Sequence, residues 1–369
     1  MLLGLTLVVL SFLRFSVNAA TVCNGHTELC DRSYGNITYV GAHNSYAVGV
    51  NNLAANQDYD LKQQLNDGVR LLQMQAHENS GDIYLCHTAW IIQWGNSAQL
   101  PQDRYETTYD FHLTYNLRYA VQTWMDAHPE DVVTLLIVNS DNLAATQFAS
   151  VYVAAGVDSM SYSPKSASLS ASSWPTLGSL IDAGTRLVTF LSTTASFDTV
   201  PYLIDEFSNV WETPFNTVDN TTFQCKRDRG TGDTSSSMYL INHFLDTLVL
   251  GNPIPDVVNA NLTNAANGTG SLGEEVAVCG GLYNRYPNFL LVDYYEYGGG
   301  SVFQVAATAN RVTYTGTVPT PKPTSGSGGP QTSSVDTGSG SGGRTSSGFG
   351  MATLFAICCV IIGAFSVFI

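Results

Sequence analysis

Basic residues are scarce in this chain. It holds 15 Lys and Arg against 30 Asp and Glu, which gives a formal net charge of -15 at pH 7. An acidic chain is repelled by phosphate backbones and by anionic membrane surfaces. The composition therefore argues against nucleic acid as a partner and against electrostatic adhesion to a membrane. The simplest role of the acidic balance is solubility.

The motifs of two other hydrolase classes are also missing. No G-x-S-x-G turn occurs in the region expected to fold, which argues against a serine hydrolase. Glycoside hydrolysis on a barrel needs two carboxylates that flank one bond, and no motif joins Asp293 to Glu296 or to Asp141. No internal repeat of solenoid or propeller length is visible either. The chain is therefore expected to form one large domain rather than an array.

Two long apolar segments lie at the ends of the chain. Residues 1–20 hold an apolar run followed by small residues, which predicts a secretory signal peptide cut after Ala19 or Ala20. The alternative, a signal anchor, needs a longer run to cross a bilayer. The apolar tail 351–369 follows a polar spacer and the small residues at 339–342, and no basic residue comes after it. This order predicts a removable GPI signal, because a C-terminal membrane helix usually carries Lys or Arg on its cytoplasmic side.

Composition divides the chain between these two signals. Residues 313–350 are rich in Pro, Thr, Ser and Gly and predict a flexible stalk. Residues 21–312 are left as one large folded domain. The expected location is therefore the cell surface, with the domain GPI-anchored to the outer leaflet of the plasma membrane. Nothing in the sequence indicates an oligomer, so a monomer is expected.

Cysteines and glycosylation sequons suit a secreted chain. Two of the seven cysteines lie in the apolar tail. Among the others we expect a short bridge, Cys23–Cys30, and a long bridge, Cys225–Cys279, with Cys86 left over and buried beside the core. The N-x-[ST] sequons predict N-glycans at Asn36, Asn220, Asn261 and Asn267.

Short apolar runs separated by helical patterns predict a parallel sheet. Two helical patterns lie at 113–130 and 173–184. The apolar runs are rich in β-branched residues and lie at 37–43, 69–77, 83–87, 131–139, 185–191, 237–244 and 289–295. This alternation and the length of the domain favour an α/β fold of the closed TIM-type (β/α)8 barrel.

Polar residues gather at the carboxyl ends of these runs, the edge at which barrel enzymes build their sites. A lone polar residue there would be an ordinary strand cap, but six runs that end alike predict a site. Side chains alternate across a strand, so Gln73, Gln75 and His77 share one face, while Arg70 points to the barrel exterior. The strand-end residues are His43, Gln75 with His77, His87, Asn139, Asn242 with His243, and Asp293.

Five segments carry a family resemblance. Together they resemble the X-domain-like phosphatidylinositol phospholipase C superfamily of PLC-like phosphodiesterases over roughly residues 23–310. Within it they are most similar to the fungal secreted, often GPI-anchored members. The segments are V-G-A-H-N-S (40–45), G-V-R-L-L-Q-M-Q (68–75), Y-L-C-H (84–87), V-V-T-L-L-I-V-N (132–139) and P-N-F-L-L-V-D-Y (287–294). The resemblance implies a distorted α/β barrel that cleaves a phosphodiester with two histidines.

The resemblance also implies a role for each matching residue. His43 corresponds to the general base that deprotonates the inositol 2-hydroxyl, and His87 to the general acid that protonates the leaving diacylglycerol oxygen. An imidazole pKa of about 6.5 suits both tasks. Asp293 corresponds to the carboxylate that orients the base histidine. Asn44 stands where bacterial members have an aspartate that orients the acid, and where calcium-dependent members have an asparagine ligand.

The charged groups of the family are missing from their usual positions. Bacterial members have an arginine at the position of Gln75, and calcium-dependent members have acidic ligands at Gln73 and Gln75. Elsewhere in the family a lysine or a calcium-binding glutamate stands near Asn139. Neutral amides are poor Ca²⁺ ligands, so neither a metal nor another cofactor is expected. Phosphoryl transfer still needs positive charge at the phosphate, and the sequence does not show which residue supplies it.

Two functions fit these residues. The first is a metal-independent phosphoric diester hydrolase that cleaves phosphatidylinositol, or a glycosylated relative such as a GPI glycolipid, and gives a cyclic inositol phosphate. The second is a family member without turnover that binds inositol lipids or surface glycans through the same rim. Under either reading the candidate substrate-binding residues are Gln73, Gln75, Asn139 and His243. A structural role is the alternative for His77 and His243.

Overall fold

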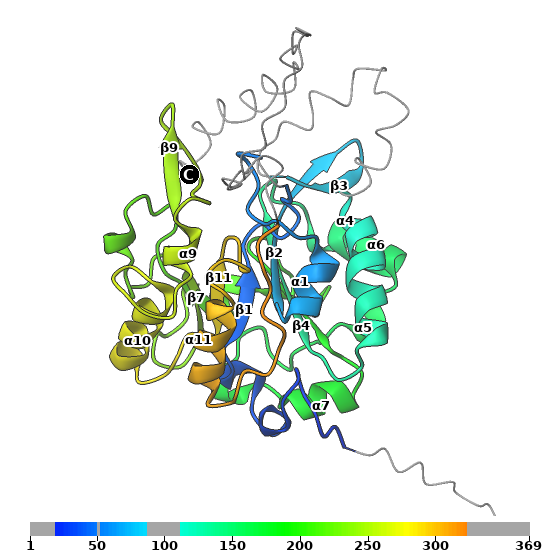
Figure 1. The fold of residues 1–369 in the computed structure, drawn as a ribbon. Coiled ribbons are helices and arrows are strands. Elements are labelled where there is room, and N and C mark those ends of the chain that lie inside the picture. Colours follow the sequence, from blue (N-terminus) through cyan, green and yellow to red (C-terminus); the bar gives the residue numbers. More distant parts are fainter. Residues whose placement is uncertain (1–18, 50–51, 87–110, 323–369) are drawn as a thin grey trace, which may run out of the picture.

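The computed structural model describes residues 19–49, 52–86 and 111–322 (Figure 1). Nearly all of the predicted signal peptide, His87, most of the predicted stalk and the apolar tail lie outside these ranges. Within the described ranges, no helix is both long enough and apolar enough to cross a membrane.

Eight strands form one curled parallel sheet. Strands β1 and β11 pair in register, from Tyr39 opposite Phe289 to Ala42 opposite Val292. The strand order is β6 (Leu203–Asp205), β5 (Leu187–Leu191), β4 (Val133–Asn139), β2 (Leu71–Asn79), β1 (Tyr39–Ala42), β11 (Phe289–Val292), β8 (Met238–Asn242) and β7 (Val210–Glu212). The strand β3 (Asp82–Leu85) pairs antiparallel with β2. The run predicted at 83–87 is therefore the second strand of a hairpin and not a barrel strand.

The sheet has the α/β barrel architecture expected from the sequence, and its distortion lies at one seam. Strands β6 and β7 are the two ends of the strand order, and in the described chain the short helix α8 (Glu206–Asn209) joins them instead of a hydrogen-bonded ladder. Neither strand was predicted. A separate hairpin, β9 (Asp246–Val249) with β10 (Asn252–Pro255), projects beyond the carboxyl ends of the barrel strands (Figure 1).

Helices cover the outer face of the sheet (Figure 1). The predicted helix at 113–130 is α4 (Leu113–Tyr115), a π-helical segment (Asn116–Gln122) and α5 (Thr123–Ala127). The one predicted at 173–184 is α7 (Leu177–Asp182). The other α-helices in the described ranges are α1 (Leu61–Asp67), α6 (Ala145–Ala155), α9 (Ala260–Thr263), α10 (Leu272–Tyr283) and α11 (Ser301–Asn310).

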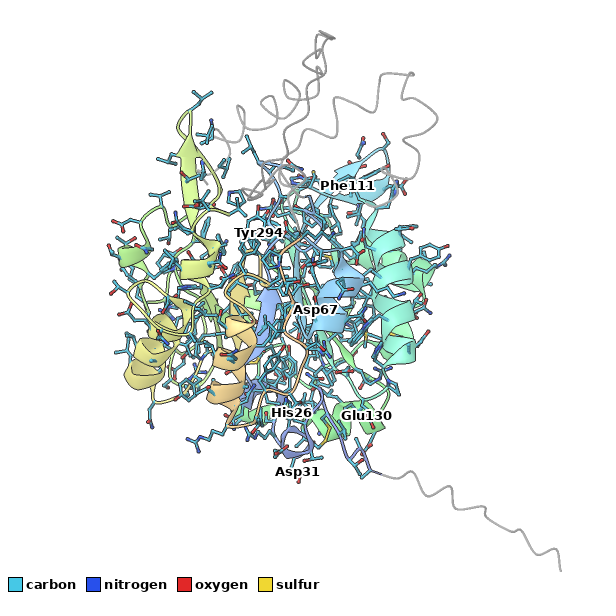
Figure 2. All side chains as sticks on the ribbon, viewed as in Figure 1. His26, Asp31, Asp67, Phe111, Glu130 and Tyr294 are labelled. Carbon is cyan, nitrogen blue, oxygen red and sulfur yellow. A yellow bond between two sulfur atoms is a disulfide. The ribbon has the colours of Figure 1, made fainter. Side chains whose placement is uncertain are left out.

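The inward-facing side chains of the strands form a core inside the barrel. Because side chains alternate along a strand, one residue in two points inward. The outward residues, such as Leu72 and Ile241, pack under the helices in a second cluster. Side chains fill both layers (Figure 2). The inner cluster includes Tyr39, Leu71, Leu136, Phe190, Leu240 and Leu291.

Residues 313–322, the first part of the predicted stalk, lie against the domain. The Tyr314 ring stacks on Phe303 of α11 with a centroid distance of 5.7 Å. The Tyr59 hydroxyl donates to the Thr320 carbonyl at 2.8 Å, and the Lys322 ammonium lies 4.6 Å from the centroid of the Tyr59 ring. The folded part of the chain therefore extends past residue 312, where composition placed its end.

Both predicted disulfides are confirmed. Cys23–Cys30 closes a loop near the N-terminus, and Cys225–Cys279 ties the segment after β7 to α10. Cys86 lies outside both bridges and is half-buried. The sequon residues Asn36, Asn261 and Asn267 are exposed and Asn220 is partly exposed, and their glycosylation stays a prediction.

Replacement of both Cys225 and Cys279 by Ser is expected to lower the free energy of unfolding by about 2–4 kcal/mol, because the bridge restricts a long loop of the unfolded chain. The bridge spans 54 residues of sequence. Urea denaturation followed by circular dichroism measures the change. Cys86→Ser is the matched control, with an expected change below about 1 kcal/mol. A double variant as stable as the wild type would contradict the stabilising role of the bridge.

Candidate functional site

A cleft of about 360 Å³ opens at the carboxyl ends of the barrel strands. Its floor continues the inner face of the sheet, where inward positions change from apolar to polar. Along β1 the inward side is apolar at Tyr39 and becomes polar at His43, directly after the strand. Along β2 it is apolar at Leu71 and polar at Gln73 and Gln75. Glu212 of β7 and Asn242 of β8 line the same cleft, and the β9–β10 hairpin forms one wall.

His43 and Asp293 form an ion-pair contact behind the cleft surface. His43 follows β1 and Asp293 follows β11, and the register of these two strands places the two residues side by side. His43 Nδ1 lies 2.9 Å from Asp293 Oδ1, and their side chains are 18% and 7% exposed. When Nδ1 carries the proton and donates it to the carboxylate, Nε2 is left as the basic nitrogen.

Two further side chains fix the imidazole. The Asn56 amide donates to Asp293 Oδ1 at 2.9 Å and lies 3.2 Å from His43 Nδ1, so two donors converge on one carboxylate oxygen. The Phe244 ring stacks on the imidazole with a centroid distance of 3.9 Å and an angle of 8° between the planes. The carboxylate sets the direction of the Nδ1–H bond and the phenyl ring sets the plane, so the position of Nε2 is fixed.

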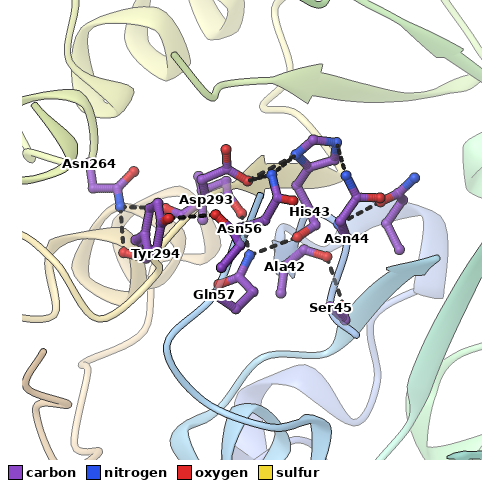
Figure 3. A network of polar contacts seen from close by, with 12 residues as sticks. Ala42, His43, Asn44, Ser45, Asn56, Gln57, Asn264, Asp293 and Tyr294 are labelled. Carbon is purple, nitrogen blue, oxygen red and sulfur yellow. Dashed lines mark hydrogen bonds and ion pairs between the residues drawn. The ribbon is translucent and has the colours of Figure 1, made fainter. Parts of the chain in front are cut away.

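Neutral amides hold the backbone around this pair (Figure 3). The Gln57 side chain donates to the carbonyls of His43 and Val292, at 2.8 and 3.1 Å, and so links the ends of β1 and β11. The Asn264 side chain donates to the carbonyls of Asp293 and Tyr294, at 2.9 and 2.8 Å. These contacts orient the site without adding net charge to it.

The residues that follow His43 and Asp293 leave the extended conformation. Asn44 and Tyr294 have φ angles of 41° and 46°, in the left-handed region. Asparagine is tolerated there, but a bulky residue such as tyrosine is an outlier that surrounding contacts must hold in place. The Tyr294 amide donates to the Asn56 carbonyl at 2.8 Å, and this bond is one such contact.

The predicted residues Asn44, Gln73 and Gln75 all line the cleft. The Asn44 side-chain amide lies 3.0 Å from His43 Nε2, and the Asn44 backbone amide donates to Gln73 Oε1 at 2.6 Å. Gln73 therefore positions Asn44, while Gln75 lies further along the same face of β2. His87, predicted as the general acid, lies outside the described residues.

Two predicted substrate-binding residues do not reach the cleft. The Asn139 amide contacts Leu143 and Thr194 in the loops after β4 and β5, at 2.9 and 2.7 Å. His243 is 0% exposed, and its ring nitrogens contact Glu275 and the carbonyl of Thr263. Both residues occupy outward positions of their strands, so the alternation of side chains turns them away from the cleft.

The other strand-end residues have structural partners. His77 Nδ1 lies 3.0 Å from Asp141 Oδ1, beyond the part of β2 that lines the cleft. Arg70 pairs with Asp131 at 2.8 Å and lies over Trp124, which confirms its predicted place outside the barrel. Within the described ranges, the one group of side chains with metal-binding spacing is Cys225, Glu275 and Cys279, whose sulfurs are bridged.

Several cleft residues have no counterpart among the predicted ones. They are Asn56, Glu212, Arg229, Phe244 and Asp246. Phe244 ends the predicted run 237–244, and Asp246 lies two residues after it. The expectation that the site lies at the carboxyl ends of these runs therefore extends to both residues. Asn56 and Arg229 lie in loops and carry no local signal.

Asp246 is one of the titratable groups that line the cleft, with His43, Glu212 and Arg229. Burial raises the pKa of Asp246 to about 7, the negative charge of Asp293 adds to the rise, and His43 opposes it. Near neutral pH this carboxyl is therefore partly protonated, and its charge depends on small changes in its surroundings.

The sequence of the chain matches a known protein family. The family model described as PI-PLC X 1 matches residues 29–310. An "Uncharacterized secreted protein" of Arthroderma benhamiae is 42% identical over 304 residues, which cover 80% of this chain and 65% of that protein. A "PI-PLC X domain-containing protein 1" of the same organism is 41% identical over 292 residues, covering 78% of this chain and 89% of that protein.

Solved structures with a similar arrangement have low sequence identity to this chain. A phosphatidylinositol-specific phospholipase C from Listeria monocytogenes is 12% identical with a TM-score of 0.49, covering 75% of this chain and 94% of that chain. A pentafluoro-Phe variant of the enzyme from Staphylococcus aureus is 16% identical with a TM-score of 0.48, covering 77% of this chain and 94% of that chain.

Asp246→Asn is expected to flatten the pH dependence of stability. Because the native pKa lies above that of the unfolded chain, the native state binds the proton more tightly, and this contribution is lost as the pH rises through about 7. The free energy of unfolding of the wild type should fall relative to that of the variant by about 2–4 kcal/mol from pH 4 to pH 8. Urea denaturation across this range measures it, and parallel curves would contradict the raised pKa.

Proposed function

The chain belongs to the PI-PLC X family, and on this basis we propose that it is a phosphoric diester hydrolase that cleaves an inositol phospholipid or glycolipid outside the cell. The observation that carries the proposal is the His43–Asp293 pair at the floor of the cleft. A carboxylate on Nδ1 and a ring plane fixed by Phe244 are what a histidine general base requires.

The proposed first step uses the inositol ring itself as the nucleophile. The proton of the 2-hydroxyl passes to His43 Nε2, and the hydroxyl oxygen attacks phosphorus as the bond to the diacylglycerol oxygen breaks. The leaving oxygen takes a proton from His87, whose part follows from its position in the family motif. In the structure Asn44 contacts Nε2, so the substrate hydroxyl takes the place of this amide.

The hairpin beside the cleft supports a lipid substrate. Its residues Gly251–Pro255 line the cleft, and its leucines Leu248 and Leu250 are 56% and 79% exposed. No charged residue occurs between Asp246 and Asp256. An uncharged hairpin with exposed leucines fits the apolar part of a lipid surface better than an anionic headgroup layer.

The proposal also includes a reaction without a bound metal and a location outside the cell. The amides of Gln73 and Gln75 stand at the cleft where acidic ligands would be needed, which supports a reaction without a bound metal. Two disulfides, and a relative named as a secreted protein, support an extracellular location. The signal peptide and the GPI tail predicted from the sequence would place a monomer at the outer leaflet.

A second candidate is lipid or glycan binding without turnover. The observation that favours it is the pairing of Arg229 with Glu212, because a cation shared with a buried carboxylate stabilises phosphate charge less than an unshared one. The two candidates differ in whether a product forms, so the same assay separates them.

The secreted domain is expected to release cyclic inositol phosphate from phosphatidylinositol vesicles, equally with and without EDTA. His43→Ala and His87→Ala should each lower turnover by at least about 100-fold, because each removes one of the two proton transfers. Phosphorus NMR detects the cyclic product.

His77→Gln is the matched control, since this histidine is paired with Asp141 outside the cleft and should leave turnover unchanged. Loss of turnover in the presence of EDTA would contradict the metal-free mechanism. Vesicle binding without product in the wild type would favour the second candidate.

Leu248→Ser combined with Leu250→Ser should reduce turnover on vesicles by about 10-fold and leave turnover of a water-soluble inositol phosphodiester unchanged, because the hairpin contacts lipid and not the reacting atoms. Exposed Val153 on α6, changed to Ser, is the control for surface hydrophobicity. Equal losses on both substrates would contradict the role in lipid contact.

A further inference from the structure

One arginine lines the cleft. Arg229 lies in an extended segment after β7, and it is the only Lys or Arg among the described residues that line the cleft. The other ionisable groups there are His43, Glu212 and Asp246. Cleavage of a phosphodiester develops negative charge on the phosphate oxygens, which needs a cation or strong donors nearby. The amides of Gln73 and Gln75 do not supply that cation.

The segment that carries Arg229 is fixed to the barrel. Glu212 and Arg229 form a β-bridge, in which the Glu212 amide donates to the Arg229 carbonyl at 3.0 Å. The next residue, Gly230, has a φ of 99°, and a Cβ there would lie 2.7 Å from the Trp211 Cα. Only glycine fits this position. Upstream, Cys225 is bridged to Cys279. Arg229 therefore starts from a rigid backbone.

The guanidinium group is held on one side and open on another. Its Nη2 pairs with the carboxylate of Glu212, and its Cζ lies 4.3 Å from the Phe215 ring centroid. The side chain is 38% exposed. Among described residues, Nη2 is the one atom of this group that donates a hydrogen bond within the chain. A planar fork fixed by one carboxylate still presents donors to a second anion.

Two buried carboxyl groups lie near Arg229, and one of them forms an ion pair with it. Glu206 and Glu212 are both buried at the end of the sheet. Burial raises the pKa of Glu206 well above its ordinary value, and the charge of Glu212 adds to the rise. The guanidinium of Arg229 contacts the Glu212 carboxylate, and this contact is its ion pair among the described residues. The pair has no net charge, so a phosphate monoanion is not repelled by it.

The strand order relates Arg229 to the general base. From β7 the sheet runs through β8 and β11 to β1, which carries His43 at its end. Three strand spacings amount to about 14 Å along the sheet. The curl of the sheet and the length of the arginine side chain shorten this distance, and both residues line the same cleft. A ligand that fills the cleft can therefore contact both residues.

We propose that Arg229, oriented by Glu212, binds the phosphate group of the substrate in this cleft and supplies the positive charge that Gln75 lacks. The ligand class is an inositol phosphate ester, either a lipid headgroup or the free phosphorylated sugar. This inference rests on the proposed function for the identity of the ligand, while the anion site itself rests on the geometry of Arg229.

The test removes the charge without leaving Glu212 unpaired. Because Arg229→Gln alone would strand a buried carboxylate, the main variant combines Arg229→Gln with Glu212→Gln, and Arg229→Lys keeps the charge but not the fork. Each secreted protein is titrated calorimetrically with myo-inositol 1-phosphate, with inorganic phosphate and with myo-inositol, and is assayed on phosphatidylinositol vesicles. Arg227→Gln is the matched control, two residues earlier and exposed, with its own bond to the Gly232 carbonyl at 2.8 Å.

The double variant should bind myo-inositol 1-phosphate at least about 10-fold more weakly, with myo-inositol binding unchanged. Its turnover should fall about 100-fold, and Arg229→Lys should recover part of both losses. The Arg227 variant and the thermal unfolding midpoints should match the wild type.

Equal weakening for myo-inositol and its phosphate would overturn the proposal, since Arg229 would then contact hydroxyl groups. Unchanged phosphate binding in the double variant, or no phosphate binding in the wild type, would overturn it as well. Inorganic phosphate bound as tightly as inositol phosphate would retain the anion site and overturn the inositol ester as its ligand. Arg229-dependent phosphate binding without any turnover would refute the proposed hydrolase and uphold this inference.

Discussion

The site depends on the two-residue alternation of side chains along the barrel strands. On β1, β2, β7, β8 and β11 the inward positions are apolar in the core and become polar at the level of the cleft. The parallel register of β1 and β11 then sets two of these polar positions, His43 and Asp293, next to each other. The pair is thus a consequence of strand packing, and loop geometry is needed only to support it.

The support is built from neutral amides. Asn56, Gln57 and Asn264 bind the carboxylate and the carbonyls around it, and none of them carries charge. A charged donor at the Asn56 position would compete with the imidazole for the proton-accepting power of Asp293. Neutral donors fix the position of the carboxylate, so among the described residues the histidine is its one cationic partner once the proton has moved. This arrangement favours a proton-accepting histidine.

The sequence predicts the strands that have long β-branched runs. It also predicts His43 and Asp293, which follow β1 and β11, because strands and strand ends are both visible in the local sequence pattern. Asn139 and His243 are predicted to bind substrate, but both side chains face outward, away from the cleft. The alternation of side chains that orients Gln73 and Gln75 on β2 also predicts this outward direction. Val138 lies two residues after the inward Leu136, and Asn242 lies two residues after the inward Leu240, so both face inward. The residue after each of them therefore faces outward. Arg229 is different. Its place follows from a β-bridge to Glu212 and from a disulfide across 54 residues, and no local pattern encodes these contacts.

The position of Arg229 in the cleft affects how anion binding depends on the charge of the neighbouring carboxyl groups. An arginine at Gln75 would lie on β2, whereas Arg229 is bridged to Glu212 of β7. Asp246, the first residue of the β9–β10 hairpin, lines the same cleft. As Asp246 loses its proton near pH 7, a negative charge appears in the cleft that also receives the phosphate. The cleft then holds the carboxylates of Glu212 and Asp246, and Arg229 is its one arginine among the described residues. Anion binding in this cleft is therefore strongest on the acidic side of neutrality, where a net-acidic surface is itself least repulsive to an anionic ligand.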